Sequence, residues 1–160
     1  HFIAKSEIRA WPVIGTLCVR TGTIFIERGK RHAVHDVLKK MSQELQAGEV
    51  VSFFPEGTTS DGRSLLPFHA NLFEAAVRAQ APVRPLVIDY LQDGQRSLIP
   101  AFIDDLSLVD CALAVLGASG LEVRMKVLDA IPSKGLSRHE LAAKVRDAML
   151  AYRSAEHLES

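Results

Sequence analysis

The stretch that decides the fold of this chain is Val50-Val51-Ser52-Phe53-Phe54-Pro55-Glu56-Gly57-Thr58-Thr59-Ser60. Residues 50–54 are typical of a buried strand, and Pro55 ends it because proline has no N–H to donate to a ladder. A carboxylate, a glycine and three hydroxyl groups follow within one turn. Since ligands of open α/β sheets bind at the carboxyl ends of strands, the sequence predicts a polar site at residues 56–60.

Strand-like and helix-like patterns alternate along the rest of the chain. Further strands are predicted at residues 23–27, 86–91 and 121–127, the last with one face in water. Helices are predicted at residues 34–45, before a stop at Gly48; at 67–79, where Pro67 occupies the first position; and after a capping box of Ser137 and Glu140. The alternation predicts an α/β fold, in which a mixed sheet is flanked by helices.

Composition indicates one domain without a broad electrostatic field. A chain of 160 residues can bury a real core but rarely makes two domains, so residues 1–160 are predicted to form a single domain. The 19 basic and 19 acidic side chains cancel, which argues against a nucleic-acid partner. Cys18 and Cys111 have no metal-type spacing and are predicted to be reduced, small core residues.

Membrane-spanning segments are not indicated by the hydropathy pattern. No apolar run approaches the ~20 residues that a bilayer crossing requires. The longest candidate, residues 111–116, is short, and we expect it to form a buried helix turn rather than a membrane contact.

Four segments resemble motifs of the glycerolipid acyltransferases, the family that includes 1-acylglycerol-3-phosphate acyltransferase. Residues 54–60 resemble its Phe-Pro-Glu-Gly-Thr-Arg-Ser motif, and residues 22–28 are similar to its second block, a strand that ends in a charged pair. Residues 81–87 resemble the proline-marked fourth block, and Ile3-Ala4-Lys5 the strand and lysine that follow the catalytic block. One short motif would be weak, but four in the family's order favour membership. The resemblance covers residues 1–90 and leaves residues 91–160 as a sheet-and-helix ending.

The family's first block, His-x-x-x-x-Asp, supplies the general base and the carboxylate that orients it. No histidine of this chain has an aspartate five residues later. In the family the block shortly precedes the segment that Phe2-Ile3-Ala4-Lys5 matches. We therefore expect an N-terminally truncated fragment of a glycerol-3-phosphate acyltransferase-like core, inactive by itself.

The resemblance implies a set of site residues. It assigns Glu56 and Gly57 to the catalytic site, and substrate binding to Lys5, Glu27, Arg28, Phe54, Pro55, Thr58, Thr59, Ser60 and Pro85. A carboxylate such as Glu56 could orient acceptor hydroxyls or basic residues, but it could also cap the turn at residues 58–62. The glycine suits a backbone conformation closed to other residues. Lys5 and Arg28 could supply positive charge, or be ordinary surface cations.

Thr59 departs from the family, which most often has arginine at this position. Arginine binds phosphate bidentately and threonine cannot, so the identity of the acceptor stays open. Asp61-Gly62 is predicted to be only a turn. A hydrolase triad of Ser60, Asp61 and His69 is disfavoured because no nucleophile-elbow pattern surrounds the serine.

The resemblance implies an O-acyltransferase of phospholipid biosynthesis, which moves a fatty acyl group from acyl-CoA or acyl-carrier protein to 1-acylglycerol-3-phosphate and so makes phosphatidic acid. It implies no metal and no bound cofactor, and a peripheral location on the cytoplasmic side of the membrane. Two alternatives remain: another lysolipid acceptor such as a lyso-ornithine lipid, or a non-catalytic module that binds a lipid head group.

Overall fold

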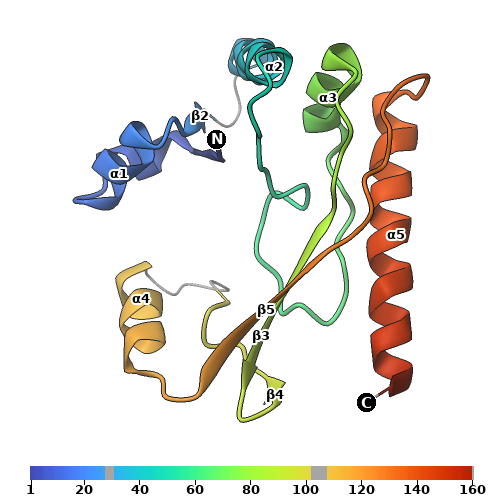
Figure 1. Ribbon diagram of the computed structural model, residues 1–160. Coiled ribbons are helices and arrows are strands. Elements are labelled where there is room, and N and C mark those ends of the chain that lie inside the picture. Colours follow the sequence, from blue (N-terminus) through green and yellow to red (C-terminus); the bar gives the residue numbers. More distant parts are fainter. Residues whose placement is uncertain (28–30, 102–107, 160) are drawn as a thin grey trace. The chain divides into compact units, whose positions relative to one another are not determined.

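The computed structural model describes residues 1–27, 31–101 and 108–159 (Figure 1). The chain divides into two compact units. Unit 1 comprises His1–Pro55, His69–Val83 and Ile131–Ala142. Unit 2 comprises Glu56–Phe68, Arg84–Ala130 and Ala143–Ser160.

Unit 1 is built on parallel pairing. Strand β1 (Ile3–Lys5) pairs with β2 (Ile24–Ile26), so that Ile3 lies opposite Ile24 and Lys5 opposite Ile26. A short 3-10 helix, η1 (Ser6–Ala10), and helix α1 (Ile14–Arg20) connect the two strands. The expected strands at residues 3–5 and 23–27 are thus confirmed.

The predicted buried strand at residues 50–54 is wrong in its extent. It is reduced to one parallel bridge between Ser52 and Phe2, in which the Ser52 N–H donates to the His1 carbonyl at 2.7 Å. Val50 and Phe54 are exposed. Beyond the bridge the pairing is not resumed at Phe54, which is exposed, and Pro55 has no N–H to donate to a ladder.

Helix α2 (Arg31–Gln46) buries the apolar face that its sequence spacing predicts. Val37, Leu38 and Met41 form a core cluster with Ile24 of β2 and with Ala75. The helix is followed by Gly48 with φ +85°, a conformation that favours glycine, so the predicted stop is confirmed.

The second predicted helix starts later than expected. Residues 67–69 are not helical; the 3-10 helix η2 (Ala70–Leu72) leads into α3 (Phe73–Ala79). The His69 N–H donates to the Pro55 carbonyl at 2.8 Å, which holds this stretch extended. Phe73 is fully buried and meets the Phe53 ring edge to face, with the ring centroids 5.1 Å apart.

Unit 2 carries an antiparallel sheet in the order β4-β3-β5, formed by β3 (Leu86–Gln92), β4 (Gln95–Arg96) and β5 (Leu121–Val127). The two predicted strands are confirmed, and left-handed Asp93 and Gly94 make the β3–β4 turn. The α/β class is confirmed, with parallel and antiparallel pairing in separate sheets of the described residues. The expectation for β5 of one buried face is wrong: alternate apolar side chains are exposed, Met125 by 66%. As the edge strand, β5 has a neighbour on one side only.

Helix α4 (Leu108–Gly117) contains residues 111–116, which were expected to be a buried turn and are not. Leu116 is 83% exposed, because only one side of the helix, at Cys111 and Val115, is partly covered. Cys18 and Cys111 are free, as predicted, but half-buried rather than in the core. In the described part of the chain no helix combines the length and the apolar character that crossing a membrane requires.

Helix α5 (Arg138–Glu159) opens with the predicted capping box. The Ser137 N–H donates to Oε2 of Glu140 at 2.8 Å, and the Glu140 N–H donates to Oγ of Ser137 at 3.3 Å. Leu141 and Val145 are buried as expected.

Met41 is buried and Met125 is exposed, so substitutions at these two positions test which residues form the core. Met41 is 1% exposed, so Met41→Ala should lower the free energy of unfolding by about 2–5 kcal/mol through lost apolar contact and a residual cavity. The matched substitution Met125→Ala removes an exposed side chain and should change it by less than about 0.5 kcal/mol. Urea denaturation measures both, and equal losses would contradict the assignment of α2 to the core.

Candidate active site

Three of the predicted site segments lie at one edge of the parallel sheet of unit 1. Lys5 lies opposite Ile26, and Glu27 follows directly. Ser52 runs parallel to Phe2, so Phe54 and Pro55 leave the sheet in the same direction. The carboxyl ends of parallel segments share an edge, which therefore presents Lys5, Glu27 and Phe54-Pro55. Arg28, which was expected to add a cation here, lies outside the described residues.

Glu56 is the first residue of unit 2, and its side chain closes the loop formed by residues 56–66. Its Oε2 accepts the backbone N–H of Leu66 at 2.8 Å, which ties together the two ends of residues 56–66. The alternative role expected for this carboxylate was to cap the turn at residues 58–62. That position is wrong, because the carboxylate accepts the backbone N–H of Leu66 instead. The half-buried side chain keeps Oε1 without a hydrogen-bond partner among the described residues.

Residues 57–62, which we call the hydroxyl turn, lie inside this loop, and their conformation depends on two glycines. Gly57 has φ +67° and Gly62 has φ +70°, values that other residues rarely adopt, so the conformational reason for Gly57 is confirmed. The Gly62 N–H donates to Oγ of Ser60 at 3.2 Å, and the Arg63 N–H donates to Oδ1 of Asp61 at 3.0 Å. The Asp61-Gly62 turn is thus confirmed, and these contacts account for Ser60 and Asp61 without a hydrolase triad.

Thr58 and Thr59 are exposed on this turn, and Pro85 is buried. The two threonine hydroxyls are therefore accessible from solvent. Pro85 precedes β3, and its carbonyl accepts the Leu128 N–H at 2.9 Å. A role of any of the three in substrate binding stays a prediction.

Arg146 of α5 was missed at the sequence level. Its Nη2 donates to the Leu65 carbonyl at 3.0 Å and its Nε to the Leu66 carbonyl at 3.3 Å. These contacts join residues about 80 positions apart, for which no local pattern exists. Arg146 reinforces the same end of the loop that Glu56 caps.

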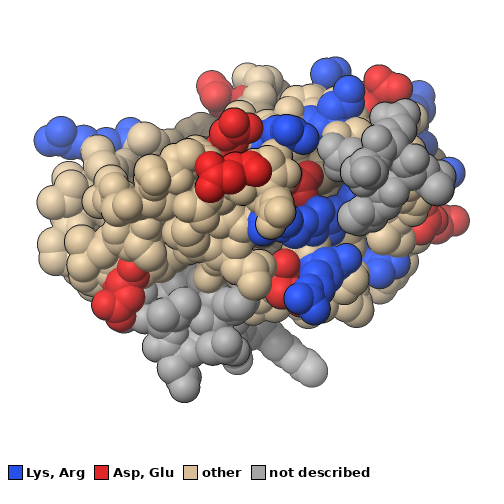
Figure 2. Space-filling model, turned by 90° about the horizontal axis from the view of Figure 1, so that it is seen from below, with Lys and Arg blue, Asp and Glu red and all other residues tan. Residues whose placement is uncertain are grey.

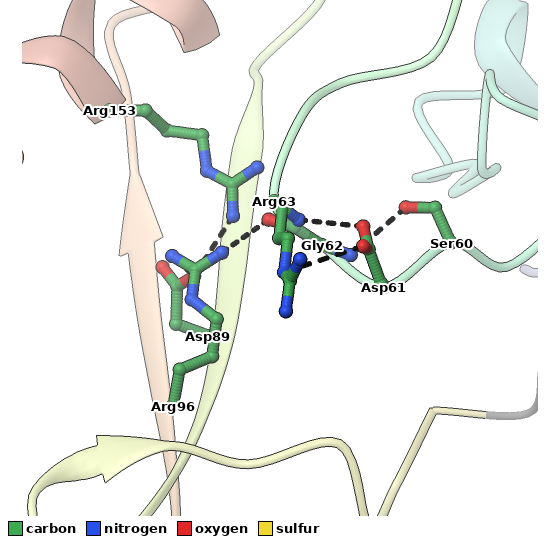
Figure 3. A network of polar contacts seen from close by, with 7 residues as sticks. All are labelled: Ser60, Asp61, Gly62, Arg63, Asp89, Arg96 and Arg153. Atoms are coloured by element: carbon green, nitrogen blue, oxygen red, sulfur yellow. Dashed lines mark hydrogen bonds and ion pairs between the residues drawn. The ribbon is translucent and has the colours of Figure 1, made fainter.

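A second polar network, also missed, is centred on Asp89 of β3 (Figure 3). Its Oδ1 accepts Nη2 of Arg96 and Nη2 of Arg153, each at 3.2 Å. Arg96 also donates through Nη1 to the carbonyl of Gly62. The network thereby links the hydroxyl turn to β3, β4 and α5.

Figure 2 shows Lys and Arg side chains interspersed with Asp and Glu side chains on the face it presents. Among the side chains that the structure describes, no cluster of three or more His, Cys, Asp or Glu residues could hold a metal ion.

Residues 1–89, which include β1, β2 and the Glu56 turn, match the sequence model of the acyltransferase family. The chain belongs to the acyltransferase family. The resemblance inferred from residues 1–90 is thereby confirmed.

Individual members of the acyltransferase family align with most of the chain. The lyso-ornithine lipid O-acyltransferase of Pseudomonas aeruginosa is 36% identical over 92% of this chain and 57% of that protein. The 1-acyl-sn-glycerol-3-phosphate acyltransferase of Neisseria meningitidis is 36% identical over 94% and 59%. The crystal structure of the 1-acyl-sn-glycerophosphate (LPA) acyltransferase PlsC from Thermotoga maritima shares the fold, with a TM-score of 0.64, 25% identity and coverage of 99% of this chain and 56% of that one. The chain thus spans less than three-fifths of each of these proteins.

The loop closure by Glu56 can be tested by amide hydrogen exchange. Glu56→Ala removes the acceptor of the Leu66 N–H, and since a hydrogen bond to a charged group contributes ~1.5–3 kcal/mol, exchange of that amide should become about 10–100-fold faster. Asp61→Ala is the control, because it should free the Arg63 amide and leave Leu66 protected. Unchanged exchange at Leu66 in Glu56→Ala would contradict the closure.

Proposed function

We propose that residues 1–160 form one acyltransferase core that binds the acceptor in an O-acyltransferase of phospholipid biosynthesis. The acceptor is 1-acylglycerol-3-phosphate and the product phosphatidic acid. The observation that carries the proposal is the position of the Phe54-Pro55-Glu56-Gly57 turn at the carboxyl end of a parallel segment, in a chain of the acyltransferase family. Relatives named as 1-acyl-sn-glycerol-3-phosphate acyltransferases, at 36% identity, support this acceptor.

The proposed reaction is direct acyl transfer from acyl-CoA or acyl-carrier protein. The acceptor hydroxyl oxygen bonds to the thioester carbonyl carbon, the C–S bond breaks, and the hydroxyl proton passes through a general base to the departing thiolate. Such a reaction needs a base, donors for the oxyanion, and a clamp for the acceptor. The base is assigned to the histidine of a His-x-x-x-x-Asp block, which is not among these 160 residues.

Each unit, taken by itself, offers groups that can bind the acceptor. Lys5 is exposed at the edge of unit 1 and offers an ammonium group to an anionic head group. In unit 2, Glu56 is held by the Leu66 amide through one oxygen, so the other oxygen can accept a hydrogen bond from an acceptor hydroxyl. The exposed hydroxyls of Thr58 and Thr59 add donors for a phosphate. The enzyme would work at the cytoplasmic surface of a membrane, where its lipid substrates lie.

A lyso-ornithine lipid is the second candidate acceptor. Thr59 replaces the arginine that would grip a phosphate, and a lyso-ornithine lipid O-acyltransferase is 36% identical over most of this chain. A non-catalytic module that binds a lipid head group would require the same clamp but no base. Measuring acyl transfer to each lysolipid distinguishes the two acceptors from one another, and an absence of transfer to both distinguishes the binding module.

The missing base gives a direct kinetic test. Residues 1–160 alone should transfer no acyl group from acyl-CoA to lysophosphatidate, whereas a version that joins them to an upstream segment carrying a His-x-x-x-x-Asp block should do so. General-base catalysis contributes ~10²–10⁴-fold, and the rate difference should be at least that large. The matched control replaces the histidine of the added block by alanine. Equal turnover with and without the block would assign the base to a histidine of the present chain, and no turnover in either would favour the binding module.

The acceptor can be decided through Thr59. In the active version, Thr59→Arg should raise kcat/KM for lysophosphatidate relative to a lyso-ornithine lipid by about 10–100-fold, because one added charge-assisted hydrogen bond to phosphate contributes ~1.5–3 kcal/mol. Gln43→Arg, at an exposed position of α2 outside the candidate site, serves as the control for added charge alone. A ratio unchanged by Thr59→Arg would mean that this position does not read the head group.

A further inference from the structure

We propose that Arg96 and Asp89 are positioning residues that hold the hydroxyl turn, residues 57–62, in the shape that binds the acceptor. This inference rests on the proposed function. Neither side chain belongs to the acyltransferase motifs quoted above, and both act through the backbone of the turn. All the contacts involved lie within unit 2.

The turn needs an anchor of its own. Glu56 and Arg146 fix the loop at Leu65 and Leu66, several residues beyond the hydroxyl groups. Between Glu56 and Leu66 the backbone takes left-handed conformations at Gly57 and Gly62. Glycine has more alternative conformations than any other residue. A contact at Gly62 therefore removes many of the arrangements otherwise open to the backbone around Thr58 and Thr59.

Arg96 provides that anchor at Gly62. It donates to the Gly62 carbonyl, while the Gly62 N–H donates to Oγ of Ser60 at 3.2 Å. Fixing Gly62 thus also fixes the hydroxyl end of the turn. Arg96 itself lies on β4 opposite Leu91 of β3, so the hairpin determines where its guanidinium begins.

Asp89 determines where that guanidinium points. Its carboxylate lies between Arg96 and Arg153, and in Figure 3 both guanidinium groups point toward it. The side chains of Asp89 and Arg153 are each only 13% exposed, so solvent screens this part of the network little. Because both contacts of Asp89 use the same oxygen, Arg153 on α5 and Arg96 on β4 are held at one point of the central strand.

Arg153 contacts Asp89 through one guanidinium nitrogen while another lacks a partner in the described part of the chain. Its Nε is buried and, among the described residues, has no hydrogen-bond partner, which is unfavourable for a charged group. The observed arrangement directs Nη2 to the carboxylate that orients Arg96.

The test uses the active version of the protein and follows three quantities. Arg96→Ala should raise the KM for lysophosphatidate about tenfold while changing kcat less than about threefold, since a positioning contact acts on how the acceptor is placed. Amide exchange at Gly62 should become faster, and the Tm should fall no more than in the control. Asp89→Asn should have the same direction with a smaller effect, and Arg96→Lys should restore part of the affinity by keeping one charged donor.

The control is Arg78→Ala, which removes an arginine–carboxylate pair with Glu74 on α3, at 2.9 Å, without touching the loop. A KM unchanged in Arg96→Ala, or one that rises equally in Arg78→Ala, would overturn the inference and leave the network purely structural. Absence of acyl transfer to any lysolipid by the unsubstituted active version would instead overturn the proposed function.

Discussion

Parallel pairing around β1 is the constraint on which the candidate site depends. Parallel neighbours cannot be joined by a tight turn, so each return to the same end of the sheet requires a crossover segment. Here η1 and α1 separate β1 from β2, and α2 separates β2 from Ser52. The crossover that returns the chain also supplies Val37, Leu38 and Met41 to the core. The same arrangement that closes the core of unit 1 therefore sends Lys5, Glu27 and Pro55 to one edge.

The two units use different forces to fix their parts. Unit 1 is held by a compact apolar cluster, in which Ile24, Met41 and Ala75 are almost completely removed from water. The loop of unit 2 is instead held by polar contacts to its backbone, from Glu56, Arg146 and Arg96. Hydrogen bonds are directional, so they specify a loop conformation where non-directional apolar packing would leave it variable.

Local patterns predicted much of this structure. The capping box, the apolar face of α2, the glycine conformation at position 57 and the strands β1, β2, β3 and β5 all depend on residues close together in the sequence. Burial was predicted poorly: Val50, Leu116 and Met125 are apolar and exposed, because burial depends on which segments arrive from elsewhere in the chain. The helix expected at Pro67 failed for a related reason, since a bond to Pro55 holds that stretch extended.

The candidate site shows the same division. Its motif residues could be identified from sequence, and the edge where Lys5, Glu27 and Pro55 lie follows from the parallel register. The contact of Glu56 with Leu66 spans ten residues, and those of Arg96 and Arg146 with the loop span 34 and about 80. No periodicity or short motif encodes such distances. They depend on how β4 and α5 are placed within unit 2.

The open edge of β5 has a consequence for how this protein behaves at high concentration. In the described sheet, β3 borders β5 on one side and no strand borders it on the other. Its unpaired backbone groups could template an incoming strand, and Val123, Met125 and Val127 would make such an addition favourable. Glu122, Arg124 and Lys126 alternate with them, so an added strand must match a negative and two positive charges. We expect these three charged side chains to disfavour the addition of strands that lack complementary charges, and so to limit aggregation.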